Sequence, residues 1–172
     1  MKNTVQGSTW REAAAALGCT FLLAGLFSQV EIQIEGAAGW AANLPTWRIE
    51  QHWLLDIFFG GRPMTGYHAF VLPFVALFFH FPVCFASNWT LRRECLVLAC
   101  LITFWIVEDF LWFATNPAFG LDQFNAAAIP WHKRWLWFAP IDYWMFSAAA
   151  VALLYVSCST PGPCPSSRQP PG

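Results

Sequence analysis

The chain has 172 residues, of which 57% are hydrophobic, 18% are aromatic and only 11% are charged. Soluble domains carry about 25% charged residues, so this composition excludes an ordinary soluble domain and indicates an integral membrane protein. The formal net charge of −1 provides no basic surface for nucleic acid, which is therefore not an expected partner. The six cysteines show no CxxC spacing and are expected to pack as small apolar residues.

Four apolar segments are long enough to span a bilayer, which takes about 20 residues in a helix. They predict an all-α fold, a bundle of four transmembrane helices that forms one membrane domain over residues 1–158. The predicted spans cover residues 13–34, 68–87, 96–115 and 140–158. The first span is too long for a signal-peptide core and is followed by acidic residues, so we expect an uncleaved helix.

The end of the first span reads "VEIQIEG", and this pattern has two interpretations. Its alternation is typical of a strand. A continued helix would instead place Glu31 and Glu35 one turn apart on the same face.

The connections between the spans differ in length. "NWTLRREC" leaves only a tight turn, so the second and third spans are expected to form an antiparallel hairpin. Within the long connection 36–66, apolar residues recur at i, i+4 and i+8 over Thr46–Phe59, which predicts an interfacial amphipathic helix. In the other long connection, 116–139, "NPAFG" ends the third span because a proline cannot continue a helix. Residues 159–172 are rich in Pro, Gly and Ser and predict a disordered tail.

An even number of spans places both termini on one side of the membrane. Basic residues are almost evenly divided between the two sides, but the pair Arg92–Arg93 occupies the shortest connection. By the positive-inside rule, this pair favours an inner or plasma membrane location with both termini cytoplasmic.

The stretch "WIVEDFLWF" inside the third span is the sharpest indication of chemistry. A lone acid near the bilayer centre costs at least about 2.5 kcal/mol, so such residues are functional candidates by default. Helical geometry places Glu108 and Asp109 on either side of one stripe that also holds Trp105 and Trp112. The structural alternative is a protonated or hydrogen-bonded acid that holds two helices together.

Tracing the chain through four antiparallel spans brings most of the ionisable residues to the same side, below the two long connections. We therefore predict a polar pocket in one half of the bilayer. Its candidate catalytic residues are Glu108, Asp109, His80 and His132. Its candidate substrate-binding residues are Trp105, Trp112, Asn116, Asp142, Glu31 and Glu35.

His80 is placed near the midplane of the second span, at a depth similar to that of the acidic pair. A histidine and two carboxylates at one depth could transfer protons or bind a metal. The structural alternative is a histidine hydrogen-bonded to a backbone carbonyl.

Cofactors leave little trace in the sequence. A divalent metal stays open, since His and carboxylate ligands are numerous but no HxxxH, HxxH, ExxH or CxxC pattern supports it. Haem is not expected because only one histidine lies deep in a span, and a nucleotide is not expected because no P-loop or Rossmann fingerprint is present.

The function that these features favour is a membrane-embedded enzyme that uses acid/base or metal-assisted chemistry on an apolar or lipid-like substrate. Two alternatives stay open: an accessory or assembly subunit of a membrane complex, and a small proton-coupled transporter. The expected partners are membrane lipid and an apolar small molecule, and an oligomer or a membrane-protein partner is a further option.

Overall fold

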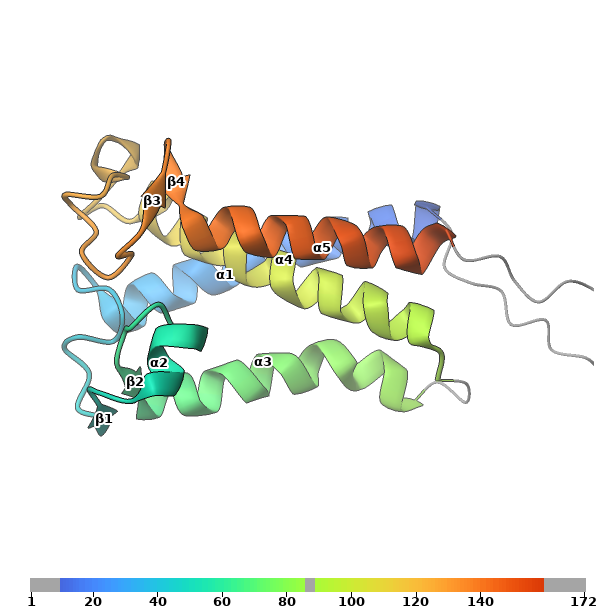
Figure 1. Cartoon of the computed structure of the whole chain (residues 1–172), viewed down its shortest axis with the longest axis horizontal. Helices are drawn as coiled ribbons and strands as arrows, with labels where there is room; N and C mark the ends of the chain where they lie inside the picture. The colour runs from blue at the N-terminus through green and yellow to red at the C-terminus, as the bar shows by residue number, and fades with distance from the viewer. Residues whose placement is uncertain (1–9, 86–88, 160–172) are drawn as a thin grey trace, which may run out of the picture.

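Four long helices run along a common direction in the computed structural model (Figure 1). The structure describes residues 10–85 and 89–159. The long helices are α1 (Trp10–Glu35), α3 (Gly66–Phe85), α4 (Leu91–Thr115) and α5 (Ile141–Ser159). Each is long and apolar enough to cross a membrane. The predicted all-α class and the four apolar helices are therefore confirmed, with ends within five residues of those predicted.

The "VEIQIEG" stretch is helical, so the helix interpretation is correct. α1 continues through Glu35, and Gly36 follows it with a φ of 64°. A left-handed glycine just beyond the last helical residue is a common way for a helix to end. Glu31 and Glu35 consequently lie one turn apart at the end of α1.

α4 is the central helix. α1 and α5 pack extensively along it, whereas α3 contacts it more sparsely on another side (Figure 1). Ala24 of α1 and Ala99 of α4 are fully buried, and small residues of this kind let helix backbones approach closely. A cluster formed by Ala24, Val75 and Phe104 joins α1, α3 and α4. The predicted hairpin of the second and third spans corresponds to α3 and α4.

The two long connections fold at the same end of the helices, which we call the loop end (Figure 1). The first contains β1 (Arg48–Ile49), α2 (Trp53–Phe58) and β2 (Met64–Thr65), and β1 pairs antiparallel with β2. The helix predicted over residues 46–59 is therefore wrong in extent. Arg48 donates to the carbonyl oxygens of Ala41 and Ala42 and its strand pairs with β2, which removes residues 48–49 from any helix.

The second connection is anchored by an apolar residue. It contains the 3₁₀ turn η1 (Leu121–Gln123) and a hairpin of β3 (Trp135–Leu136) with β4 (Ala139–Pro140), which leads directly into α5. Ile129 is fully buried in a cluster with Ile32, Trp112 and Phe113. This cluster holds the following residues, His132 among them, against α4. The predicted disordered tail begins at Ser159, the last residue of α5, and its remainder lies outside the described residues.

Candidate functional site

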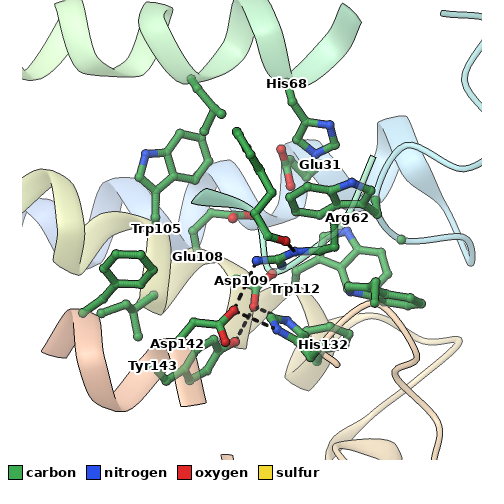
Figure 2. A pocket seen from close by; sticks show the side chains of 18 of the residues that line it. Glu31, Arg62, His68, Trp105, Glu108, Asp109, Trp112, His132, Asp142 and Tyr143 are labelled. Carbon is green, nitrogen blue, oxygen red and sulfur yellow. Dashed lines mark hydrogen bonds and ion pairs between the residues drawn. The ribbon is translucent and has the colours of Figure 1, made fainter. Parts of the chain in front are cut away.

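A cavity of about 390 Å³ lies between the helices near the loop end (Figure 2). Small-molecule sites typically have about 300–1,000 Å³, so the volume suits a small ligand. α1, α3, α4 and α5 and both long connections contribute to its wall. Every predicted site residue lines it except His80 and Asn116, and those that do are Glu31, Glu35, Trp105, Glu108, Asp109, Trp112, His132 and Asp142.

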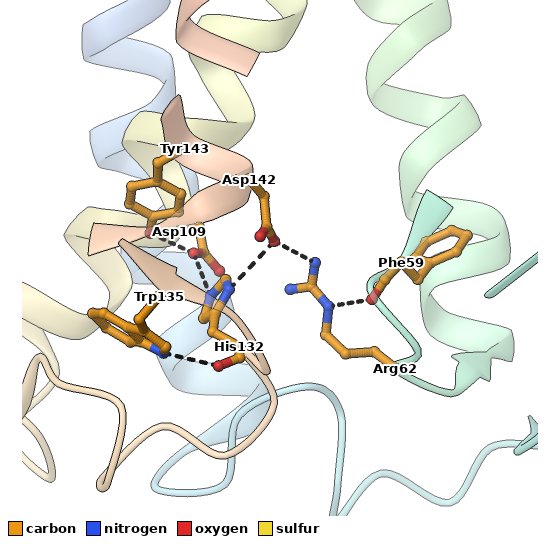
Figure 3. A network of polar contacts seen from close by, with 7 residues as sticks. All are labelled: Phe59, Arg62, Asp109, His132, Trp135, Asp142 and Tyr143. Carbon is orange, nitrogen blue, oxygen red and sulfur yellow. Dashed lines mark hydrogen bonds and ion pairs between the residues drawn. The ribbon is translucent and has the colours of Figure 1, made fainter. Parts of the chain in front are cut away.

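The adjacent acids Glu108 and Asp109 enter two different environments. Asp109 belongs to a network of ion pairs with the second connection and α5 (Figure 3). His132 Nε2 lies 3.1 Å from Asp109 Oδ2, and the hydroxyl of Tyr143 donates to the same oxygen at 2.5 Å. Asp109 is therefore held by partners on two sides.

His132 lies between two carboxylates. Its other ring nitrogen, Nδ1, is 3.5 Å from Asp142 Oδ2, which is an ion-pair distance longer than a good hydrogen bond. Burial of the ring lowers the pKa of His132, but the carboxylates of Asp109 and Asp142 outweigh this effect, and the pKa lies above its ordinary value. The protonated ring can donate from both nitrogens, which fits its two acidic neighbours.

Arg62 closes this network from the first long connection. Its guanidinium donates to Asp142 Oδ2 at 3.2 Å and to the carbonyl oxygen of Phe59 at 2.8 Å. It also lies over the ring of Trp40, with Cζ 4.2 Å from the ring centroid. With His132 protonated, the two cations balance the two aspartates, and the network as a whole is neutral.

Glu108 points instead toward α1 and α3. Its side chain lies beside that of Glu31, and Glu31 Oε1 accepts a hydrogen bond from the hydroxyl of Tyr67 at 2.6 Å. Two neighbouring carboxyl groups in a buried site favour a proton on one of them. Glu108 is only 3% exposed, so such a proton would be held away from bulk solvent.

Three side chains of the cavity wall carry a buried polar atom that makes no hydrogen bond among the described residues. One is His132 Nδ1, which lies at ion-pair distance from Asp142. The other two are Oε1 of Glu108 and Nε1 of Trp112. Both side chains line the cavity, and they lie four residues apart on the same face of α4. Buried polar groups are almost always paired, so two unpaired atoms on one face of α4 are unusual.

Glu35 has a structural role. Its carboxylate accepts hydrogen bonds from the backbone N–H groups of Trp40 and Ala41, the latter at 2.5 Å. Both of these residues have positive φ values, 56° and 51°, which L-amino acids rarely adopt. The carboxylate thus stabilises a strained turn that carries Trp40 into the cavity wall, and Glu35 acts on the site through this turn.

His80 lies outside the site. Its Nε2 is 2.9 Å from Oε1 of Glu94, in the first turn of α4, and its Nδ1 is 2.7 Å from the carbonyl oxygen of Ala76. Glu108 lies 14 residues farther along α4, or about 21 Å. α3 and α4 are antiparallel, so a residue late in α3 meets the beginning of α4 rather than its acidic pair.

Asn116 also lies outside the cavity wall. It is the C-cap of α4, its side-chain amide donates to the carbonyl oxygen of Gly36 at 2.8 Å, and its Oδ1 accepts from the backbone N–H of Ala118. These bonds join the ends of α1 and α4. The prediction placed Asn116 at the correct end of the helix, but its side chain is used by the backbone.

Sequence reasoning missed several residues that shape the site: Arg62, Tyr67, His68 and Tyr143. Tyr143 follows Asp142 in the first turn of α5, so its proximity to the acidic pair could have been inferred. His68 is buried, bonded to Thr65 and stacked on Trp40. The position of Arg62 depends on the turn at Gly60 and Gly61, both with positive φ, and carried no clear signal.

The ionisable residues of the cavity lie toward the loop end, beside the rings of Trp40, Phe59, Phe113 and Trp131, and the wall toward the middle of the helices is apolar. Glu35, Arg62 and His132 belong to the loop end. The residues farther from it, one or more turns into α3, α4 and α5, are Leu72, Ile102, Trp105, Ile106 and Phe146. The wall therefore suits a molecule with one polar end and an apolar body.

Within the described ranges 10–85 and 89–159, no three His, Cys, Asp or Glu side chains are arranged to hold a metal ion. No protein-family model matches the chain, and neither a curated protein nor a solved structure is detectably similar to it. The site is therefore interpreted from its own geometry.

Proposed function

We propose that this chain is an integral membrane protein whose four long helices cross the bilayer with both termini cytoplasmic. Its outward faces support this arrangement, because large apolar side chains remain exposed along whole helices. On α3, Phe70 is 73% exposed, Leu77 70% and Phe81 61%. A helix that is apolar on every side is either buried in protein or surrounded by lipid. In the same arrangement α2, with Trp53 65% exposed, lies in the membrane interface.

We further propose that the cavity is the active site of a membrane-embedded enzyme that acts by acid/base chemistry on an apolar or lipid-like substrate. The single observation that carries this proposal is the buried, unpartnered Oε1 of Glu108 at the cavity wall. We take this unpaired oxygen of a cavity-lining side chain as the atom that meets the substrate. Glu108 would give a proton to the substrate or take one from it.

The surrounding residues support this role. Glu31 lies beside Glu108 and would restore its proton, and the hydroxyl of Tyr67 orients Glu31. The neutral network around Asp109 keeps the neighbouring charge fixed while the proton on Glu108 moves. Asp109 and His132 are thus assigned to positioning and charge balance, and Glu108 to proton transfer.

The test uses vesicles made from a lipid extract of membranes that express the full chain. Purified wild type and Glu108→Gln are incubated with them in D₂O, and all lipid species are compared by mass spectrometry. We expect wild type to change the mass, retention time or deuterium content of at least one species, and Glu108→Gln to leave it unchanged. Glu50→Gln, at an exposed position, is the matched control and should act like wild type. No altered species with wild type, or full conversion by Glu108→Gln, would contradict the proposal.

Membrane insertion and orientation have a separate test. Single-cysteine variants at exposed position 122 of the loop end and at native Cys19 of α1 are exposed to a membrane-impermeant thiol reagent in intact cells. We expect extraction of the chain only by detergent, and labelling of the cysteine at position 122 alone. Release of the chain by alkaline carbonate would contradict insertion.

A further inference from the structure

The two unpartnered atoms of α4 restrict the headgroup of the ligand. Glu108 and Trp112 are four residues apart, so their Cβ atoms are separated by about 5–6 Å. Both side chains are buried, 3% and 4% exposed, and both line the cavity. The two side chains therefore share one stretch of the cavity wall.

The chemistry of the two atoms differs. Trp112 Nε1 can only donate a hydrogen bond, so the headgroup must contain an acceptor. The unpaired oxygen Oε1 of Glu108 can accept a hydrogen bond, so the headgroup must also contain a donor. The required group is therefore both a donor and an acceptor.

This requirement separates the common headgroups. An ammonium donates but cannot accept, so it leaves Trp112 unpaired. A carboxylate or a fully ionised phosphate accepts but cannot donate, so it leaves Glu108 Oε1 unpaired. A hydroxyl both donates and accepts, and it carries no charge.

The rest of the wall indicates where the body of the ligand lies. The side chains beyond Glu108 and toward the middle of the helices are apolar: Leu72, Ile102, Trp105, Ile106 and Phe146. With its hydroxyl between Glu108 and Trp112, a ligand would extend its apolar part along this wall. It would lie in the same direction as the surrounding lipid chains.

We infer that the cavity binds a neutral lipid alcohol, whose hydroxyl accepts a hydrogen bond from Trp112 Nε1 and donates one to Glu108 Oε1. This inference names the substrate class of the proposed enzyme and rests on that proposal for the catalytic role of Glu108. The geometry of binding itself does not require turnover.

The test is photolabelling of the full-length wild type in vesicles. The probe is a long-chain alcohol with a photoreactive group next to the hydroxyl end, and labelled residues are located by peptide mass spectrometry. The matching amine, carboxylate and methyl ether probes have the same chain. We expect the alcohol to label cavity residues at least about tenfold more efficiently than each of the others, which is the effect of one lost hydrogen bond with a buried partner. Equal labelling by alcohol and methyl ether would overturn the inference, because an ether cannot donate.

Two tryptophan variants give a matched comparison. Trp112→Phe keeps a ring but removes the free N–H, and should weaken alcohol labelling by about tenfold. Trp105→Phe changes another tryptophan in the wall and should weaken it by less than about twofold. Equal effects would overturn the inference, and if Trp112→Phe does not fold, the four probes on wild type decide the question.

The two proposals can fail independently. Alcohol labelling of the cavity combined with full conversion by Glu108→Gln would refute the enzyme and keep the binding site. Conversion of a lipid that carries no hydroxyl, lost in Glu108→Gln, would keep the enzyme and refute the alcohol.

Discussion

His132 is the residue whose removal tests the ion network most sharply. It is 2% exposed at its side chain and lies between the carboxylates of Asp109 and Asp142, which are 29% and 26% exposed. Removal of one partner from a fully buried ion pair costs about 3–5 kcal/mol. Both aspartates face a cavity and keep Tyr143 and Arg62 as partners, so we expect His132→Asn to lower the free energy of unfolding by about 2 kcal/mol. For a chain of this length this corresponds to a decrease of about 4–8 °C in Tm.

The effect depends on pH because His132 stabilises the fold as a cation. Its folded-state pKa lies above the ordinary value of 6.5, so its contribution is complete below that pH. As the pH rises through the folded-state pKa, the ring loses its proton and the contribution is lost. The gap between wild type and His132→Asn should therefore be widest below pH 6.5 and narrow at higher pH.

The assay is thermal unfolding in mild detergent, followed by circular dichroism across this pH range. The control is His52→Asn: His52 is exposed and its ring caps α2, a role that asparagine fills well. This control should stay within about 0.5 kcal/mol of wild type. The reasoning would be refuted if His132→Asn were equally neutral, or if its gap to wild type were the same at every pH.

Three further predictions concern single residues around the cavity. A Cβ on Gly39 would lie 2.5 Å from the ring of Trp131. Gly39→Ala should therefore displace that ring and lower the free energy of unfolding by about 1–3 kcal/mol, measured by the same thermal assay. An unchanged Tm would contradict this packing of Gly39 against Trp131. Tyr67→Phe removes the hydroxyl that orients Glu31, so it should lower turnover of the lipid species by about tenfold or more with little change in Tm. Turnover at the wild-type rate would show that the Tyr67–Glu31 hydrogen bond has no role in catalysis. His80→Gln should convert lipid at the wild-type rate, since His80 is paired outside the cavity, and a large loss of turnover would contradict its placement.

Much of the fold follows from features that act along the chain. Length and apolarity predict the four helices, and an antiparallel path through a membrane predicts that both long connections meet at one end. The same path brings Glu31, Glu108 and Asp142 to one cavity. These predictions hold because they depend only on helix rise and on the order of the segments.

The remaining features depend on contacts between distant residues. The helix predicted over residues 46–59 was too long. Its apolar spacing fits a helix, but Ile49 pairs with Met64 in a β-ladder, and this pairing is not visible in the local sequence. His80 was misplaced because depth along a span does not determine which end of the neighbouring helix it meets. Glu108 and Asp109 enter separate environments because neighbouring side chains of a helix diverge by about 100°. Periodicity predicts this divergence, but it cannot tell which neighbouring segment each side chain meets.

The central claim is that Glu108 carries a proton shared with Glu31 while Asp109 is fixed in an ion network. Infrared spectroscopy of the purified protein in lipid tests it most directly, because a protonated carboxyl has its own C=O absorption. We predict such a band in wild type at neutral pH, with a shift in D₂O. The band should lose intensity in Glu108→Gln, where the amide can donate to Glu31 instead, and keep its intensity in Asp109→Asn. Undiminished intensity in Glu108→Gln, or a loss of intensity in Asp109→Asn alone, would contradict the account.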